Sequence, residues 1–467
     1  PPLKDKTIHT GCFFNAIENN VLKDCVGAVV GNPPFASKLD TAGAQRAYER
    51  YQAEHGALPD KQLAYLFLQS SMGLLAPGGV LSMLQQYNFL YNQKSLPFRR
   101  RFIERWDVRE ILDFISVRGL FQKGGADTKV VVVVAEAQEP PLDRKILHAT
   151  FRRSGRADAE QGFDIDYYDM HWLPRELVLR NDGVWRTDLL GGGRLLGFVN
   201  RLKRYRTLEA LAAESSWEIG EGWIFGNAAD AHPAAHVVGK HSVPANTFCD
   251  GELSPSSFRK VPDRPIQWPR RPEIYMPPLL LIHKHEDLPF GTWNKSYLTY
   301  QHTILGVSAT SGNRAELARA AAWLSSQKRA LQAILVSSGT AALASKATAV
   351  LSDDILQLPF PEEWDLRITL HEQILIDDIV DYYRELVRLG HESSAMKKTG
   401  VSGLPEFNNV FTSRINGVYR KNTLRALEAH TWQGVICQPY IFGKGKIDWT
   451  GADELEGKLN ALLSEER

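Results

Sequence analysis

The sequence predicts an α/β protein of more than one domain, and three observations support this. The chain has 467 residues, which is longer than one hydrophobic core usually serves. Its composition, 43% hydrophobic and 23% charged, is that of a globular protein. Between about residues 7 and 137, short apolar runs alternate with helical patterns, which is typical of a largely parallel sheet with helices on both sides.

The region from about residue 7 to residue 137 contains separate sequence signals for its strands and helices. A small apolar run at 27–30 and the five valines at 130–134 indicate strands, and the valines indicate one covered on both faces. Apolar residues recur at helical spacing over 61–75, and Pro77-Gly78-Gly79 marks the turn that follows. The remaining elements expected here are strands at 80–84 and 111–114 and a helix at 96–105.

Beyond residue 137 the pattern changes several times. A charged connecting stretch is expected over 138–184, a basic helix over 195–206, and short strands within the aromatic, Pro/Gly-rich region 215–310. Single long helices are expected over 315–335 and 370–389. The domain boundaries that we predict are 1–137, 138–210 for a linker and connecting helix, 211–392, and 393–467 for a small helical or irregular C-terminal segment.

Composition argues against several protein classes. The four cysteines are far apart and form no CxxC pair, which favours a reducing cytosol over a disulfide framework or a zinc ribbon. No apolar run approaches the ~20 residues that a membrane span needs. His232 and His236 have helical spacing, but Pro233 makes an ordinary loop the better interpretation, so we assign no metal.

Basic residues are clustered although the net charge is only +1. Together the clusters could line a track for a polyanion, and solvated surface is an equally good interpretation of charge alone. The residues that we single out as DNA-binding candidates are Arg99, Arg100, Arg101, Arg201, Lys203, Arg204, Arg270 and Arg271.

The strand at 27–30 ends in Asn32-Pro33-Pro34-Phe35. Each proline fixes its own φ and restricts the preceding residue, so the Asn32 side chain is held rigidly at the carboxyl edge of the sheet. The amide oxygen of Asn32 and the carbonyl of Pro33 could accept the two hydrogens of an amino group, while Phe35 offers a stacking face. The alternative is a stiff strand-to-helix turn with an incidental asparagine.

Three ordered blocks resemble the N6-adenine DNA methyltransferases of type I and type IIG restriction-modification and related phage-defence systems. The first is the Asn-Pro-Pro-Phe motif itself. The second runs from Leu74-Leu75-Ala76-Pro77-Gly78-Gly79-Val80 into Tyr87-Asn88-Phe89-Leu90, and the third comprises Ile111-Leu112-Asp113-Phe114, Phe121 and Thr128-Lys129-Val130. Residues 217–361 look like the target-recognition domain of the same enzymes.

The resemblance implies a fold, an activity and partners. The fold would be a Rossmann-like methyltransferase sheet, without its N-terminal part, followed by an α+β target-recognition domain and a small C-terminal segment. The activity would be transfer of a methyl group from S-adenosylmethionine to N6 of an adenine that is flipped out of double-stranded DNA. The protein would act in the prokaryotic cytoplasm, with other restriction or defence subunits as partners. Asn32, Pro33, Pro34 and Phe35 would be catalytic. Tyr87, Asn88 and Thr128 would line the substrate pocket.

The chain departs from the family pattern on the cofactor side. The Gly-rich loop and the acidic residue expected before the catalytic motif do not precede Asn32, and Gly11-Cys12 stands where the family has Gly-Asp. We assign cofactor contacts to Gly11, Cys12 and Phe13, and expect the first cofactor motif to lie in sequence missing from the start or in another chain. A catalytically silent DNA-recognition subunit, and a methylase of RNA or of protein glutamine, remain alternatives.

Overall fold

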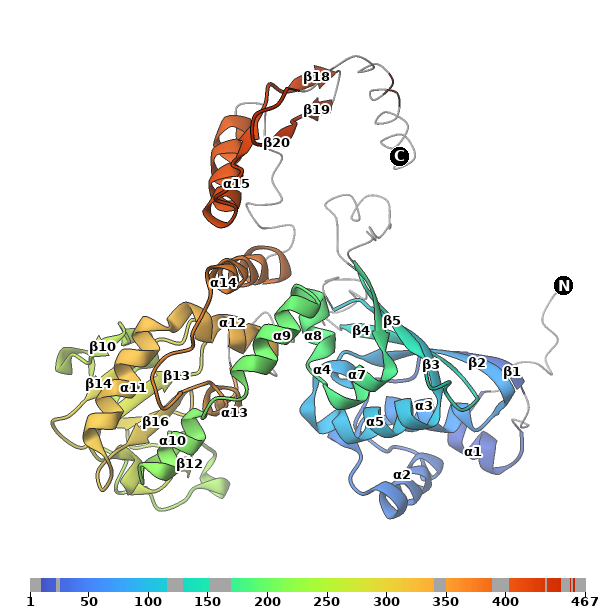
Figure 1. Cartoon of the computed structure of the whole chain (residues 1–467). Coiled ribbons are helices and arrows are strands. Elements are labelled where there is room, and N and C mark those ends of the chain that lie inside the picture. Colours follow the sequence, from blue (N-terminus) through green and yellow to red (C-terminus); the bar gives the residue numbers. More distant parts are fainter. Residues whose placement is uncertain are drawn as a thin grey trace. The chain divides into compact units, whose positions relative to one another are not determined.

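The computed structural model divides into two compact units (Figure 1). The first comprises Pro1–Ile368 with Glu372–Met396, and the second comprises Thr369–His371 with Lys397–Arg467. The residues that the structure describes are 10–21, 26–115, 129–151, 169–339, 350–388, 403–432, 435–446, 454 and 457.

A six-stranded sheet forms the N-terminal part of the first unit. Its strand order is β1-β2-β4-β3-β5-β6, and the bounds are Val26–Gly31, Leu75–Gln86, Asp107–Asp113, Val130–Glu136, Lys145–Thr150 and Met170–Pro174 for β1 to β6. The prediction of a largely parallel sheet is wrong, because β4 runs antiparallel to both neighbours and β6 runs antiparallel to β5. A run of valines indicates burial in either direction, so the pattern alone could not determine strand polarity.

The stretch expected to connect two domains adds strands to this sheet. β5 pairs with β3 in parallel, and β6 closes the far edge. At the opposite edge, β1 leaves Val30 84% exposed and Val26 39% exposed, with Val80 of β2 at 39%. One face of the β1 edge is therefore apolar and bare.

Figure 1 shows α3 and α5 on the same side of the sheet, and the opposite face is less covered, since Val132 and Val134 of β4 are only half-buried. Thr41 caps α2 by accepting the Ala44 N–H at 3.2 Å, and α3 buries Leu68 and Met72. The helices up to residue 214 are α1 Phe13–Glu18, α2 Ala42–His55, α3 Leu63–Met72, α4 Asn88–Tyr91, α5 Leu96–Arg105, α7 Arg175–Arg180, α8 Val184–Leu190, α9 Gly193–Leu202 and α10 Leu208–Glu214.

The second part of the first unit is built on a five-stranded sheet of order β10-β14-β13-β16-β7. Its central strand β13 carries the run Leu279-Leu280-Leu281-Ile282, and all four side chains are fully buried. The strands here are β7 Glu218–Glu221, β8 Ile224–Phe225, β9 His241–Val243, β10 Gly251–Glu252, β11 Arg259–Lys260, β12 Ile266–Trp268, β13 Leu279–His283, β14 Phe290–Trp293, β15 Thr299–Tyr300 and β16 Ile304–Ser308.

Alternate residues of β13 face different cores. Leu280 and Ile282 belong to the large core that also contains the six-stranded sheet. Leu279 and Leu281 belong to a smaller core with Tyr300 and other aromatic residues. Since side chains alternate along a strand, this continuous apolar run is the signature of a strand covered on both faces.

The helix expected over 315–335 is two helices, α11 Arg314–Ser326 and α12 Lys328–Ser338. The break falls at Gln327, whose ψ of 14° ends α11 while its N–H still bonds to the Trp323 carbonyl. α13 Ser352–Leu356 and α14 Leu370–Tyr382 follow, and the helix expected to reach residue 389 continues only as a π-helical segment, Tyr383–Arg388.

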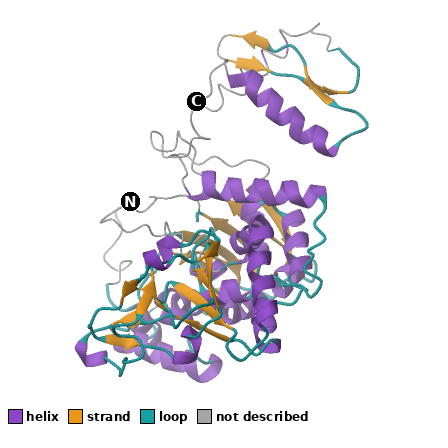
Figure 2. Ribbon diagram, turned by 90° about the vertical axis from the view of Figure 1, so that its left-hand side faces the viewer, coloured by secondary structure: helices purple, strands orange, loops and turns teal. Residues whose placement is uncertain are grey.

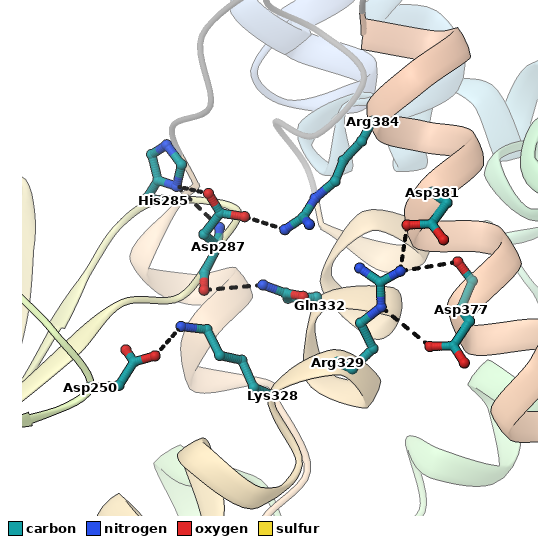
Figure 3. Close-up of polar contacts among 9 residues, drawn as sticks. All are labelled: Asp250, His285, Asp287, Lys328, Arg329, Gln332, Asp377, Asp381 and Arg384. Carbon is teal, nitrogen blue, oxygen red and sulfur yellow. Dashed lines mark hydrogen bonds and ion pairs between the residues drawn. The ribbon is translucent and has the colours of Figure 1, made fainter. Parts of the chain in front are cut away.

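Polar side chains of α12 link the β-rich part to the segment after residue 371 (Figure 3). Lys328 pairs with Asp250 in the loop before β10, and the amide of Gln332 donates to the Asp287 carbonyl at 3.1 Å. Arg329 bonds in the other direction, to Asp377 at 3.3 Å and to Asp381 at 2.5 Å. The polar side chains of α12 thus contact segments on both sides of the helix.

The second unit is small. It contains α15 Leu404–Val418 and two antiparallel strand pairs, β17 Leu424–Ala426 with β20 Tyr440–Phe442, and β18 His430–Trp432 with β19 Val435–Cys437 (Figure 2). Asn416 ties the helix to β17, because its side chain accepts from Leu424 N at 2.5 Å and donates to Leu424 O at 2.9 Å. Among the helices that the structure describes, none is long and apolar enough to cross a membrane.

A buried polar network crosses the six-stranded sheet. His148 of β5 lies between Asp113 of β3 and Asp188 of α8, with each nitrogen–oxygen distance 3.3 Å. Tyr91 of α4 donates to the same Asp113 carboxylate. Burial by itself lowers the pKa of His148, but the hydrogen bonds that its ring donates to the two carboxylates outweigh it and raise that pKa to about 9. The imidazolium therefore cross-links two strands and two helices.

We expect Gly222→Ala to destabilise the first unit strongly. A Cβ at position 222 would lie 1.8 Å from the Tyr300 carbonyl oxygen, so the backbone must move, at a cost of about 1–3 kcal/mol or more. Urea denaturation measures this loss. Gly251→Ala is the control, since a Cβ at that position meets nothing within 4 Å. Equal stability of the two variants would contradict the close approach at Gly222.

The His148 network predicts a pH-dependent stability. The pKa of His148 is raised from 6.5 in the unfolded chain to about 9 in the folded one, so its stabilisation is complete below pH 6.5. Roughly 3 kcal/mol is lost as the pH rises through 9. His148→Gln should remove most of this slope in urea titrations, whereas His241→Gln, at an exposed histidine, should keep it. A slope unchanged in His148→Gln would refute the assignment.

Candidate functional site

The ends of several strands meet at one edge of the six-stranded sheet. β1 is parallel to β2, β3 is parallel to β5, and β4 runs antiparallel between β2 and β3. The carboxyl ends of β1, β2, β3 and β5 and the start of β4 therefore lie at a common edge. Asn32, Tyr87 and Asp113 stand at that edge, which is where open α/β sheets bind ligands.

The Asn-Pro-Pro-Phe segment is fixed at both ends. Before it, Gly31 pairs with Met83 of β2 and lies so close that a Cβ would be 2.9 Å from the Met83 sulfur-bound methyl. After it, the Ala36 carbonyl accepts the Leu63 N–H at 3.0 Å, which joins the loop to the start of α3. The loop therefore has little freedom to shift relative to the sheet.

Within this loop the side chains differ in exposure. Pro33 is buried and anchors the turn, Phe35 is half-buried, and Asn32 is exposed. In the described part of the chain, the Asn32 amide has no hydrogen-bond partner. The structure thus presents an amide, a proline carbonyl and an aromatic ring in sequence at the sheet edge, as the motif predicts, with the amide left available to a ligand.

Tyr87 and Asn88 follow directly from the end of β2 and are both half-buried. The Tyr87 N–H donates to the Lys129 carbonyl at 3.1 Å, which joins this corner to the start of β4. Burial, and secondarily the charge of Asp60, raise the pKa of the Tyr87 phenol, so the ring stays neutral. Thr128, the third expected pocket residue, lies outside the described residues.

Sequence reasoning missed the buried network of His148, Asp188 and Tyr91 behind this edge. Asp113 was noticed only as part of a motif. The signal that could have revealed it is a histidine within the strand-like segment Lys145–Thr150, but this segment lies in the stretch 138–184 that we expected to connect two domains. Through Asp113 the network fixes the end of β3, because the second carboxylate oxygen of Asp113 accepts the Ile115 N–H at 2.9 Å.

The expected cofactor residues lie at the start of α1. The Cys12 thiol is 3.0 Å from the Thr41 hydroxyl, and Phe13 stacks on Phe67 at 4.7 Å between ring centroids. Partial burial raises the pKa of Cys12, but the Thr41 hydroxyl and the N–H groups of two helix starts outweigh it and lower the pKa overall.

These residues do not form a complete pocket for S-adenosylmethionine. Between Thr10 and Gly31 the only carboxylate that the structure describes is Glu18, and it is paired with Arg46 at 2.5 Å and Arg50 at 2.9 Å. The ribose hydroxyls of such a cofactor need a free carboxylate, as in dinucleotide sites. The described residues therefore fit the target amine at Asn32 better than they fit the ribose of the cofactor.

Most of the basic residues expected to contact DNA have partners within the chain. Arg99 is buried, its pKa is lowered to about 10 by burial, and its guanidinium donates to the Phe89 carbonyl at 2.6 Å. The other paired cations are Arg101 with the Tyr51 hydroxyl, Arg201 with Glu372, Arg270 with Glu221 and Arg271 with Glu218.

Three candidates differ from that pattern. Lys203 and Arg204, just past α9, are exposed and have no ion-pair partner among the described residues. Arg100 is half-buried, and its Nε has no hydrogen-bond partner there. The basic clusters in the sequence therefore contain both cations with partners inside the protein and cations without an ion pair among the described residues. Burial and pairing in the structure distinguish the two groups.

Comparison with known proteins gives a family for part of the chain. The family described as Eco57I restriction-modification methylase matches residues 13–121, which include the Asn-Pro-Pro-Phe motif and α1 to β3. No curated protein matches the chain.

Solved structures give weaker likenesses. A modification subunit of a putative type I restriction enzyme from Vibrio vulnificus YJ016 is 19% identical over 28% of this chain and 26% of that chain, with a TM-score of 0.22. The type IIG restriction endonuclease BpuSI is 15% identical over 76% of this chain and 48% of that chain, with a TM-score of 0.30. The type IIL restriction-modification enzyme MmeI, in a structure with DNA, is 10% identical over 85% of this chain and 54% of that chain, with a TM-score of 0.38.

The matches cover between about a quarter and about half of the length of these proteins. The resemblance to restriction-modification methylases is confirmed over residues 13–121, which match that family and contain the first two sequence blocks and the beginning of the third.

Proposed function

We propose that this chain is a site-specific DNA methyltransferase that modifies the N6 amino group of adenine, within a restriction-modification or phage-defence system. The observation that carries the proposal is the rigidly held, exposed Asn32 at the carboxyl edge of the sheet, inside the segment that matches a methylase family. The proposal that the chain also recognises its DNA target rests on the resemblance of residues 217–361 to a target-recognition domain.

The chemistry assigned to the motif needs no strong base. The adenine, extruded from the duplex, would donate its two amine hydrogens to the Asn32 amide oxygen and the Pro33 carbonyl, while Phe35 stacks on the ring. Both acceptors favour the positive charge that grows on the amine nitrogen as it attacks a methyl group. Tyr87 and Asn88 would line the pocket, and Pro34 would keep the turn rigid.

The methyl donor of the proposal is S-adenosylmethionine, which supplies an electrophilic methyl group. Gly11, Cys12 and Phe13 are its proposed contacts in this chain, through the N-terminal end of α1. Glu18, the carboxylate that the structure describes between Thr10 and Gly31, is paired with two arginines and is therefore not a free acceptor for the ribose hydroxyls.

Double-stranded DNA is the proposed substrate, and restriction or defence subunits are proposed partners. Among the first unit's candidates, Lys203, Arg204 and Arg100 are the cations that we retain for phosphate contact, because their charges are not neutralised within the described chain. Affinity carried by such contacts falls steeply with salt.

A catalytically silent DNA-recognition subunit is the second candidate. Cys12 in place of the family's aspartate, together with the committed Glu18, favours it. Calorimetry with S-adenosylmethionine separates the two. Binding by the chain supports the enzyme, whereas DNA binding without any cofactor binding supports the silent subunit.

We expect Asn32→Ala to lower the rate of adenine methylation by about 100-fold or more, because one of two acceptors for the amine is removed. The assay is transfer of labelled methyl to duplex DNA, with the modified base identified by mass spectrometry. Asn409→Ala, at an exposed position of α15, is the control and should retain the normal rate. Normal methylation by Asn32→Ala would disprove the assigned mechanism.

A further inference from the structure

A basic cleft lies within the second unit. It is an open cavity of ≈ 870 Å³ between two turns, and its lining includes the cations Lys421, Arg425, Lys444 and Lys446 and no acidic residue. The first turn follows α15 and the second follows β20. Sequence clustering did not single out these residues, because the two turns are separated by about 20 positions along the chain.

The two turns are held side by side by specific contacts. Tyr419 directly precedes the first turn, Phe442 directly precedes the second, and their rings meet edge to face at 5.8 Å. Arg425 spans the gap, since its guanidinium donates to the Gly443 carbonyl at 2.9 Å and to the Gly445 carbonyl at 3.2 Å. Arg425 is therefore a positioning residue that also contributes charge.

Glycine makes the second turn possible. Gly443 has a φ of +78°, in the left-handed region, and its N–H donates to the Thr423 carbonyl of the first turn at 3.0 Å. Position 445 is also restricted, because a Cβ there would lie 2.4 Å from the Ile441 side chain. The sequence Gly443-Lys444-Gly445-Lys446 thus places two lysines beside Lys421.

The three lysines lack any counter-charge within the described residues. Lys421, Lys444 and Lys446 are all exposed, and no carboxylate lies within ion-pair distance of them in that part of the chain. This contrasts with the first unit, where Arg270, Arg271 and Arg201 are each paired with a glutamate. Like charges gathered without a partner repel one another, and an external polyanion relieves that repulsion.

We infer that this cleft binds the phosphate backbone of double-stranded DNA, independently of sequence, and so gives the chain a second DNA contact besides the target site. Lysine ammonium groups and an arginine are the groups that neutralise phosphates. The open cavity between two turns suits a continuous backbone that passes through it. The choice of DNA as the polyanion rests on the proposed function, whereas phosphate binding follows from the cleft alone.

The test is the salt dependence of DNA binding by the full chain, measured by fluorescence anisotropy with a labelled non-target duplex between about 50 and 200 mM KCl. Replacing the three lysines together by alanine should reduce the slope of log affinity against log salt by about 2.7, because each lost contact removes roughly 0.9. The Lys421→Arg/Lys444→Arg/Lys446→Arg variant should keep the wild-type slope.

A charge-matched control separates the cleft from net charge. Arg180, Arg319 and Arg367 are exposed and already paired with neighbouring glutamates, and their joint replacement by alanine should leave the slope nearly unchanged. A wild-type slope in the lysine-to-alanine variant would overturn the inference, as would a wild-type chain that binds no duplex at low salt. Failure of the catalytic proposal is distinct, since it is read from methylation by Asn32→Ala.

Discussion

The burial of β13 on both faces is the constraint on which the first unit depends. Four consecutive side chains of this strand are inaccessible to solvent, two toward each core. A one-residue slip of register would exchange the faces of all four. Leu280 and Ile282 share their core with the six-stranded sheet, so the motif-bearing sheet and the β-rich part are joined by a continuous hydrophobic core.

α12 completes that body by combining an apolar interior with a polar edge. Most of its residues are buried, while Lys328, Arg329 and Gln332 bond to loops and helices on either side (Figure 3). Partly buried charged contacts of this kind define geometry more than they add stability. They specify where the loop before β10 and the segment after residue 371 must dock, which the apolar contacts alone would leave less defined.

How much could be predicted from the sequence depended on whether the signal was local. The strand before Asn32, the helix α3 and the valine strand β4 were predicted because each is a single run with clear periodicity or clear boundaries. Strand polarity, the addition of β5 and β6 to the sheet, and the break at Gln327 were not predicted, because they depend on contacts between distant segments. The same limit applies to the site. Asn32 was recognised from its neighbours, but whether Arg201 faces solvent is decided by Glu372, which lies 171 residues further along the chain.

The bare face of β1 has a consequence for the chain in solution. β1 is an edge strand of six residues, Val26–Gly31, with no charged side chain and no proline. Val26 and Val30 are exposed, and Val29 is partly buried against the core. Edge strands normally carry lysine, proline or a bulge that prevents pairing with other molecules. The register of β1 on β2 is irregular between Val26 and Ala28, but β1 carries neither lysine nor proline, so its regular part can pair with another strand. Within the part of the chain that the structure describes, this edge is a place where two copies could pair, and such pairing would become faster at higher protein concentration.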